Sequence, residues 1–404
     1  MQQLLTISPP PERKKPDHPL LAHGFRPFYL LAALYGAFFL NAWLVVLLGA
    51  APSPVSYPPV IWHGHEMLFG FVLAAVCGFL LTAMSTWSQA PPVTGRRLGV
   101  LVGLWVAGRL AMWFADLLHP LTVALLDLAL IPALGIAVLP VVLAPGNRKH
   151  MTIYIVLALL FAANLMVHLE RLAGIEWAAE AGLLLGVDVI VVLLVVVIGR
   201  LVPTFCAVAR IGEGGGKPPV HPALEALAIG SALIVLAADL VDPESFWTGI
   251  AALAAAAAQL PRIARWRPGR LIREPHIWGF HLGYAWLIAG FAFKGVAALD
   301  GPIPAISALH AFTAGGMGTT ILVVMATVGL LHTGRPLPIR PIVQAAILLA
   351  TAAAFVRTAA PILFYEQYKE ALIAAGALWG LAFVIYAVVY WPILSRPRPD
   401  GIPG

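Results

Sequence analysis

Two histidines and a glutamate stand within four positions near the start of a long apolar run, IWHGHEMLFGF, at residues 61–71. Ionisable side chains inside a membrane are costly to keep unless they have a partner or a function. An H-x-H pair at a bend is a common way to hold copper or zinc, so His63 and His65 are predicted ligands whose imidazoles converge. Glu66 either orients one imidazole or is a carboxylate favoured at a helix N-terminus.

The composition indicates the kind of protein that must position these residues. Of 404 residues, 60% are hydrophobic and only 11% are charged, with a mean hydropathy of +0.89. Such a chain is one polytopic membrane bundle and not a set of soluble domains. Its net charge of +6 therefore concerns membrane topology and not nucleic acid. Cys77 and Cys206 both lie in apolar runs, so no disulfide framework is implied.

Hydrophobic runs of about 20 residues predict an all-α protein. We expect a single transmembrane domain over 21–394, a disordered cytoplasmic tail over 1–20 and a second tail over 395–404. Twelve spans are predicted, at 27–49, 65–87, 98–115, 120–143, 151–173, 177–199, 222–241, 246–262, 277–299, 305–331, 341–360 and 371–392.

Basic residues gather on one side of these spans. With the amino terminus inside, the inner loops and tails hold most of the 25 Lys and Arg residues, Arg262 among them. Acidic residues such as Asp116 and Asp242 collect on the outer side. This positive-inside pattern predicts that both termini are cytoplasmic.

This topology assigns each histidine to one end of the bundle. Candidate ligands of an outer metal site are His63, His65, His168 and His310. Catalytic roles are assigned to His65, His310 and Glu66. Candidate ligands of an inner site, formed by two of the set, are His23, His276, His281 and His332. His310 and His332 lie about 33 Å apart on one helix, so they cannot share a metal.

Charged side chains within the spans also need partners. Arg109 and Arg357 can pair with carboxylates such as Asp116 or Glu366, or with heme propionates, which a guanidinium fork matches. Asp127 and Asp188 are either proton-relay groups or hydrogen-bonded structural residues.

A weak internal repeat relates the two halves of the chain. GFRPFYLLAALYGAFF at 24–39 resembles GFHLGYAWLIAGFAFK at 279–294, and a glycine follows five residues after both His65 and His310. Spans 1–3 are thus a candidate copy of spans 9–11. Small residues at Gly70, Ala74 and Gly78, and again near Gly315, either allow close helix packing or leave room for a flat macrocycle.

Several motifs together resemble the NnrS family over nearly the whole chain. They are HPLLAHGFRPFY, WHGHEMLFGFVLAAVCGFLLTA, GRLVPTF, HLGYAWLIAGF, ALHAFTAGGMGTTILVVM and HTGRPL. The resemblance implies a twelve-span bacterial inner-membrane protein that contains heme and copper and takes part in the nitric oxide response. It also implies b-type heme as a cofactor, and His23, His276, His281, His332, Arg109 and Arg357 are the residues that we expect to contact it.

Three functions follow from these observations. The first is an enzyme that reduces nitric oxide (NO) to nitrous oxide at an outer heme–copper site, with electrons from a quinol or a redox protein. The second is a membrane protein that handles or senses NO or metal without turnover. The third is a secondary transporter, since twelve spans with internal repeats also fit that class.

The first prediction concerns topology. Reporter fusions near Ala90 and Gly215 should report cytoplasm, and fusions near Ala51 and Gly301 should report periplasm, because the basic loops stay inside. The measurement is the activity of a reporter that is functional on only one side. Reversed signals would overturn every side assignment above.

Overall fold

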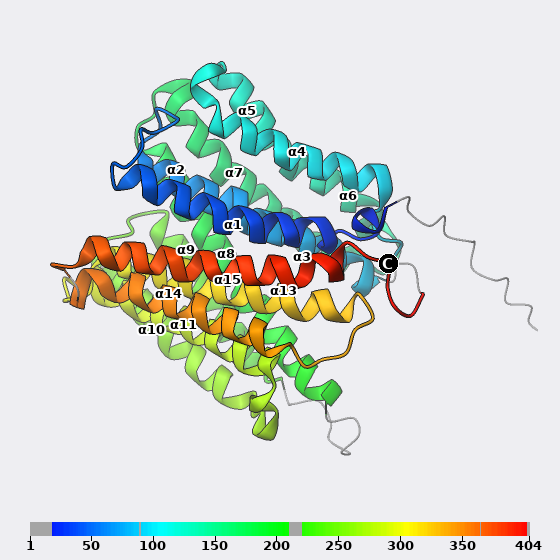
Figure 1. Ribbon diagram of the computed structural model, residues 1–404. Coiled ribbons are helices and arrows are strands. Elements are labelled where there is room, and N and C mark those ends of the chain that lie inside the picture. The colour runs from blue at the N-terminus through cyan, green and yellow to red at the C-terminus, as the bar shows by residue number, and fades with distance from the viewer. Residues whose placement is uncertain (1–17, 89, 210–219, 364, 402–404) are drawn as a thin grey trace, which may run out of the picture.

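The protein is a bundle of long helices, many of which run nearly parallel or antiparallel (Figure 1). The computed structural model describes residues 18–88, 90–209, 220–363 and 365–401, and within these residues there is no β-strand. Helices suit a membrane because each satisfies its own backbone N–H and C=O groups where water is absent. The all-α prediction is confirmed.

The α-helices, in chain order, are α1 (Phe25–Leu47), α2 (Pro59–His65), α3 (Leu73–Ser88), α4 (Gly95–Trp113), α5 (Pro120–Leu128), α6 (Leu130–Leu143), α7 (Thr152–Ala173), α8 (Ala178–Ala209), α9 (Pro222–Asp239), α10 (Phe246–Arg265), α11 (Pro275–Ala298), α12 (Ala305–His310), α13 (Thr319–Leu331), α14 (Pro341–Leu363) and α15 (Tyr368–Leu394). Short helical segments are η1 (Pro19–Leu21), η2 (Glu66–Val72), η3 (Ala115–Leu117), η4 (Arg148–Met151), η6 (Gly269–Arg273) and η7 (Ala311–Gly318).

In the described part of the chain, nine helical stretches are long and apolar enough to cross a membrane. Some of them are composite: α2, η2 and α3 form one rod over Pro59–Ser88, and α12, η7 and α13 form another over Ala305–Leu331. The remaining long helices α4, α10 and α11 pack alongside without meeting the same standard. Membrane character is confirmed, and twelve crossings stay a prediction.

The two composite rods form the centre of the bundle. In their most apolar windows 83% and 89% of residues are buried, more than in any other candidate span of the described chain. Each rod contains a π-helical segment that begins directly after a histidine, η2 after His65 and η7 after His310. Such wider turns are rare and often occur at functional sites.

The last helix of the described chain returns to the first. The last helix, α15, packs against α1 (Figure 1), and the guanidinium of Arg26 donates to the carbonyl oxygens of Leu394 and Arg396 at 2.7 and 2.8 Å. The start of the predicted carboxyl tail is therefore held against the bundle. Residues 1–17 of the predicted amino tail lie outside the described residues.

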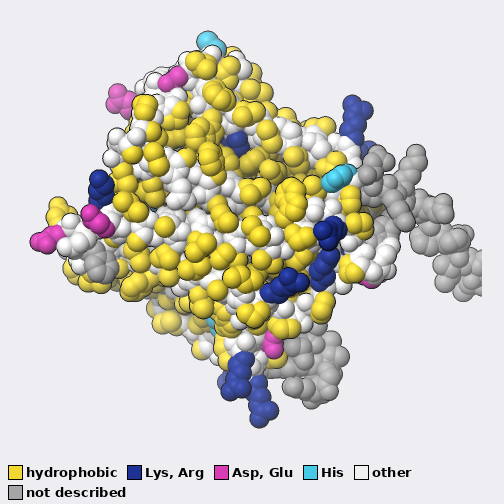
Figure 2. Space-filling model, viewed as in Figure 1, with side chains coloured by type: hydrophobic (Ala, Val, Ile, Leu, Met, Phe, Trp, Pro, Cys, Tyr) yellow, Lys and Arg dark blue, Asp and Glu magenta, His cyan; other side chains and the backbone are white. Residues whose placement is uncertain are grey.

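The surface agrees with residence in a membrane. In the view of Figure 2 a broad hydrophobic belt separates the two ends, and most Lys and Arg side chains lie toward the end at which the carboxyl terminus is found. Most acidic side chains in this view lie toward the opposite end.

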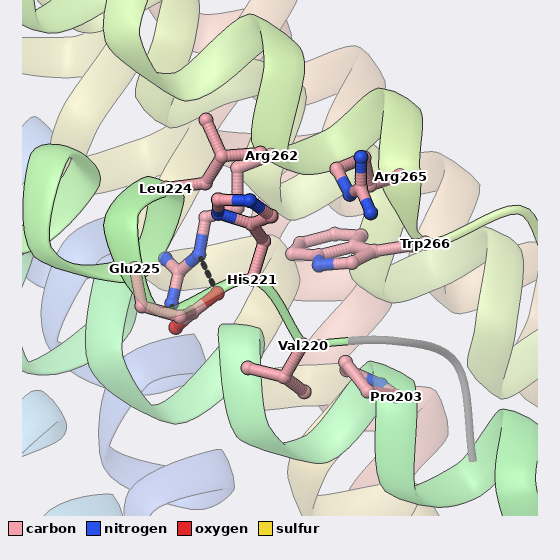
Figure 3. A pocket seen from close by; sticks show the side chains of 8 residues that line it. All are labelled: Pro203, Val220, His221, Leu224, Glu225, Arg262, Arg265 and Trp266. Atoms are coloured by element: carbon pink, nitrogen blue, oxygen red, sulfur yellow. Dashed lines mark hydrogen bonds and ion pairs between the residues drawn. The ribbon is translucent and has the colours of Figure 1, made fainter.

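One buried arginine ties four helices together. Arg262 of α10 pairs with Glu225 of α9 beside a small cleft (Figure 3) and donates to the carbonyl of Val195 on α8 at 2.7 Å and the hydroxyl of Tyr284 on α11 at 2.9 Å. A Cβ at Gly199 would lie 1.9 Å from this guanidinium, so only glycine fits there. The prediction of a loop residue was wrong: Arg262 is 2% exposed and lies within the helix.

Candidate metal centre and adjoining cavity

His65 lies at the centre of a buried polar group. It is the last residue of α2, its side chain is fully buried, and both ring nitrogens face oxygen atoms. Nδ1 lies 2.9 Å from Oε1 of Glu66, while Nε2 lies 3.1 Å from Oδ2 of Asp127 and 2.9 Å from Oδ1 of Asn164. The imidazole is thus held from two sides.

A second imidazole reaches the same carboxylate. Nε2 of His168, on α7, lies 3.0 Å from Oδ2 of Asp127, on α5. Ligand atoms of His65, Asp127 and His168 all lie within 4.8 Å of one another, and this is the one such group of three or more found among the described residues. Ligands around a metal at about 2.0–2.1 Å stand at similar separations, so small adjustments would let the group bind a metal.

Arg109 of α4 closes the group from the other side. Its guanidinium donates to both Glu66 and Asp127. The hydroxyl of Tyr35, on α1, donates to Glu66 and accepts from Nε1 of Trp113 at 3.1 Å. A continuous chain of hydrogen bonds therefore leads from α1 and α4 to His65.

The buried charges of this group do not cancel. Glu66 and Asp127 carry two negative charges when ionised, and Arg109 supplies one positive charge between them. An uncompensated charge at membrane depth is costly. The group therefore favours one more positive charge, which is either a proton on an imidazole or carboxyl group, or a bound cation.

An apolar cavity lies on the other face of α2. Its volume is about 330 Å³, within the range of small-molecule and cofactor sites, and its wall is mainly aliphatic and aromatic side chains of α1, α2, η2, α8, α12, η7, α14 and α15. Four ionisable side chains line it: His63, Glu180, His310 and Arg357.

Three polar side chains at this cavity have nitrogen atoms that could bind a ligand. His63 stacks on Trp43, with ring centroids 4.0 Å apart, and its buried Nδ1 has no hydrogen-bond partner among the described residues. His310 uses Nδ1 on the carbonyl of Ile306 at 2.9 Å, which leaves the lone pair of Nε2 for another partner. Nη1 of Arg357 is also buried and unpartnered within the described part of the chain.

Comparison with known proteins settles the family. The profile of the NnrS protein family matches residues 19–398. The chain belongs to the NnrS family. No curated protein matches the chain. Every residue of the buried group and of the cavity wall lies within the matched part.

The predicted outer site of NnrS is divided by the structure into two places. His65 and His168 meet at Asp127, whereas His63 and His310 line the cavity. The expected convergence of His63 and His65 was wrong, because residues i and i+2 of a helix face different sides. Glu66 lies beside His65 as expected, and its role stays a prediction.

The predicted inner histidines of this NnrS chain lie in three environments. The rings of His23 and His332 are 5.8 Å apart. His276 packs edge-on against Phe205, and His281 directs Nδ1 to the carbonyl of Ile277 at 2.8 Å. The structure thus pairs His23 with His332, and a site formed there stays a prediction.

Arg109 pairs with protein carboxylates, one of the two expected kinds of partner, but these are Glu66 and Asp127 and not the named example Asp116. Asp116 instead lies in η3, where Ser56 donates to it at 2.6 Å and Arg171 pairs with it at 3.4 Å. The hydrogen bond from Ser56, more than the charge of Arg171, lowers the pKa of Asp116 below its ordinary value. Arg357 lies against the ring of Tyr368 at 5.8 Å.

The glycine stripes serve close packing. A Cβ at Gly70 would meet the ring of Tyr35 at 2.5 Å, and one at Gly315 would meet Trp286 at 2.4 Å. Aromatic side chains of neighbouring helices occupy this space, so the alternative of room for a macrocycle beside these glycines was wrong. At Gly70 the close approach is what brings Tyr35 to Glu66.

Sequence reasoning missed two members of the group, Asn164 and Tyr35. Asn164 stands four residues before His168, so both side chains face the same side of α7, and its amide donates to Asp127 at 2.8 Å. The position of Asn164 on the same face as His168, within an apolar span, could have indicated that it belongs to the site. Tyr35 carried none, because tyrosine is common in apolar helices.

The second prediction concerns Arg109. Arg109→Gln leaves two buried carboxylates without their cation, so we expect a loss of about 3–5 kcal/mol in stability, measured as thermal unfolding in detergent. The additional change Glu66→Gln should recover part of this loss. Arg171→Gln, which breaks an exposed pair, is the matched control and should cost at most about 1 kcal/mol. Equal effects of both arginine changes would contradict the assignment.

Proposed function

We propose that this NnrS protein crosses the bacterial cytoplasmic membrane twelve times, with both termini in the cytoplasm, and reduces nitric oxide to nitrous oxide at a heme–copper site near its outer side. The family's association with the nitric oxide response supports the substrate. The observation that carries the proposal is the buried convergence of His65, Asp127 and His168.

Copper is the metal that we propose for this group. Imidazole suits copper, and one added positive charge would neutralise the two carboxylates and Arg109. His65, His168 and Asp127 would hold the ion, and Asn164 and Glu66 would orient the imidazoles from the next layer of contacts. Bound copper would supply one-electron chemistry and affinity for NO.

The chain's own residues can also deliver protons. Reduction of two NO molecules consumes two electrons and two protons and yields nitrous oxide and water. Tyr35 contacts Glu66, and Glu66 contacts His65, so a proton entering near α1 can reach the centre through adjacent hydrogen bonds. Glu66 is therefore the proposed proton-transfer residue.

The cavity is our proposed heme site. Its apolar wall suits the macrocycle, and the free nitrogens of His63 and His310 are candidate iron ligands. The unpartnered nitrogen of Arg357 matches a propionate. Bound heme would carry electrons from a quinol or a redox protein. NO is small and apolar, so it can arrive through the bilayer and the same cavity.

An ancient repeat is part of this proposal. Both central rods have the same local order of short α-helix, terminal histidine and π-helical segment. Each histidine lies near an arginine of a later helix, Arg109 for His65 and Arg357 for His310. One ancestral metal-binding unit would account for both arrangements.

A second candidate function is NO or metal handling without turnover. The same buried group favours it equally, since ligation alone needs no proton path. NO consumption distinguishes the two functions. A secondary transporter is the third possibility, and it predicts a purified protein without a heme absorption band.

The third prediction tests copper. His65→Ala, His168→Ala and Asp127→Asn should each abolish copper binding and NO consumption while the helical fold persists, and Glu66→Gln should weaken binding by about 10- to 100-fold. Elemental analysis gives copper per protein, and an NO electrode with an artificial donor gives turnover. His119→Ala is the control. Wild-type copper content in all four variants would contradict the proposed copper site.

The fourth prediction tests heme. His310→Ala and His63→Ala should lower the ratio of heme to protein and shift the Soret band, because each removes a nitrogen that faces the cavity. Arg357→Gln should weaken heme retention less. The matched comparison is alanine at His23 and at His332. If those two variants lose heme while the cavity variants keep an unchanged spectrum, the heme lies at the inner level instead.

A further inference from the structure

A second set of buried charges lies outside the metal centre, the cavity and the Arg262 contacts. Asp188 of α8, Asp239 of α9 and Lys294 of α11 face one another between three helices. Asp188 and Asp239 are 7% and 6% exposed, and the ammonium of Lys294 lies 2.8 Å from Oδ1 of Asp239. The carboxyl group of Asp188 acts directly on that of Asp239.

The charges of this triad do not balance if all three groups are ionised. Two adjacent carboxylates and one ammonium leave one negative charge in an apolar surrounding. Two like charges this close repel strongly where water is largely absent. Within the described chain, Asp188 and Asp239 interact electrostatically with each other and with Lys294. Among these described residues, Lys294 is therefore the one positive charge that compensates the two carboxylates, and one negative charge stays uncompensated.

The hydrogen bonds have a matching deficit. Both carboxyl oxygens of Asp239 are buried, and neither accepts a hydrogen bond of regular geometry within the described residues, although Lys294 is close. A buried acceptor without a donor is destabilising, because it has lost its hydrogen bonds to water and gained none. One proton on the Asp188–Asp239 pair would correct both deficits, because it removes the excess charge and supplies the missing donor.

We propose that Asp188, Asp239 and Lys294 form a proton-binding site in which the two carboxyl groups share one exchangeable proton and Lys294 stays charged. The site lies close to water. Asp239 is the last residue of α9, the exposed and charged Asp242 and Glu244 follow within five residues, and the Lys294 side chain is 14% exposed. A proton can therefore exchange at this end of the bundle. The site shares no residue with the metal centre and does not depend on the proposed NO chemistry.

Infrared spectroscopy of the purified full-length protein tests this site. At neutral pH the wild type should show the C=O stretch of a protonated carboxylic acid, and this band should shift in D₂O. Asp188→Asn and Asp239→Asn should each remove it, and Asp188→Glu should shift it. Lys294→Met, which removes the counter-charge, should roughly double its intensity, because both carboxyl groups then take a proton. Asp116→Asn is the surface control and should change nothing.

Two results would overturn the proposal. One is a protonated-carboxyl region of the spectrum that is the same in the wild type, Asp188→Asn and Asp239→Asn, because any band present would then belong to other carboxyl groups such as Glu66. The other is a wild type that lacks the band but is stabilised by Na⁺ against heat, since the occupant would then be a metal cation. If one asparagine variant does not fold, the other variant and Asp188→Glu still identify the band, because each changes only this pair of carboxyl groups.

Discussion

The carboxylate of Asp127 organises the helices around His65. It is 3% exposed, and it accepts from Asn164, contacts both His65 and His168, and pairs with Arg109. These contacts join α5 to α2, α4 and α7. Without water or a strong hydrophobic driving force between helices in lipid, such polar contacts fix how the helices rotate against each other. The positions of both imidazoles follow from that rotation.

The proposed function and the stability of the bundle would therefore depend on the same residues. The group that would hold a metal is also the group that holds four helices in register. A buried ionic group is a weak source of net stability, but removal of one partner is strongly destabilising. Loss of activity in a variant of this group is informative only beside a measurement of folding, which is why exposed arginine and histidine controls accompany the buried ones.

The sequence was sufficient for the class of fold and for the histidines worth testing. Apolar length was sufficient for the helical segments, and the alternation of sides placed His65 and His168 at the same end of the bundle. It could not choose between faces of a helix. Asp127 was left between a relay and a structural role, and Arg109 was given other partners, because interhelical contacts depend on rotations that a single chain's hydrophobicity does not encode. The separation of His63 from His65 could have been predicted from the sequence, because residues i and i+2 of a helix lie on opposite faces.

That separation has a mechanical consequence. His63 turns to the cavity and His65 to the buried group, and only Gly64 stands between them. A Cβ at Gly64 would meet Leu183 at 2.7 Å, so this turn of α2 is wedged against α8 and has little rotational slack. A force on the His63 imidazole would reach His65 through this single turn of helix. A ligand that moved His63 in the cavity would therefore also disturb the geometry of the Asp127 group.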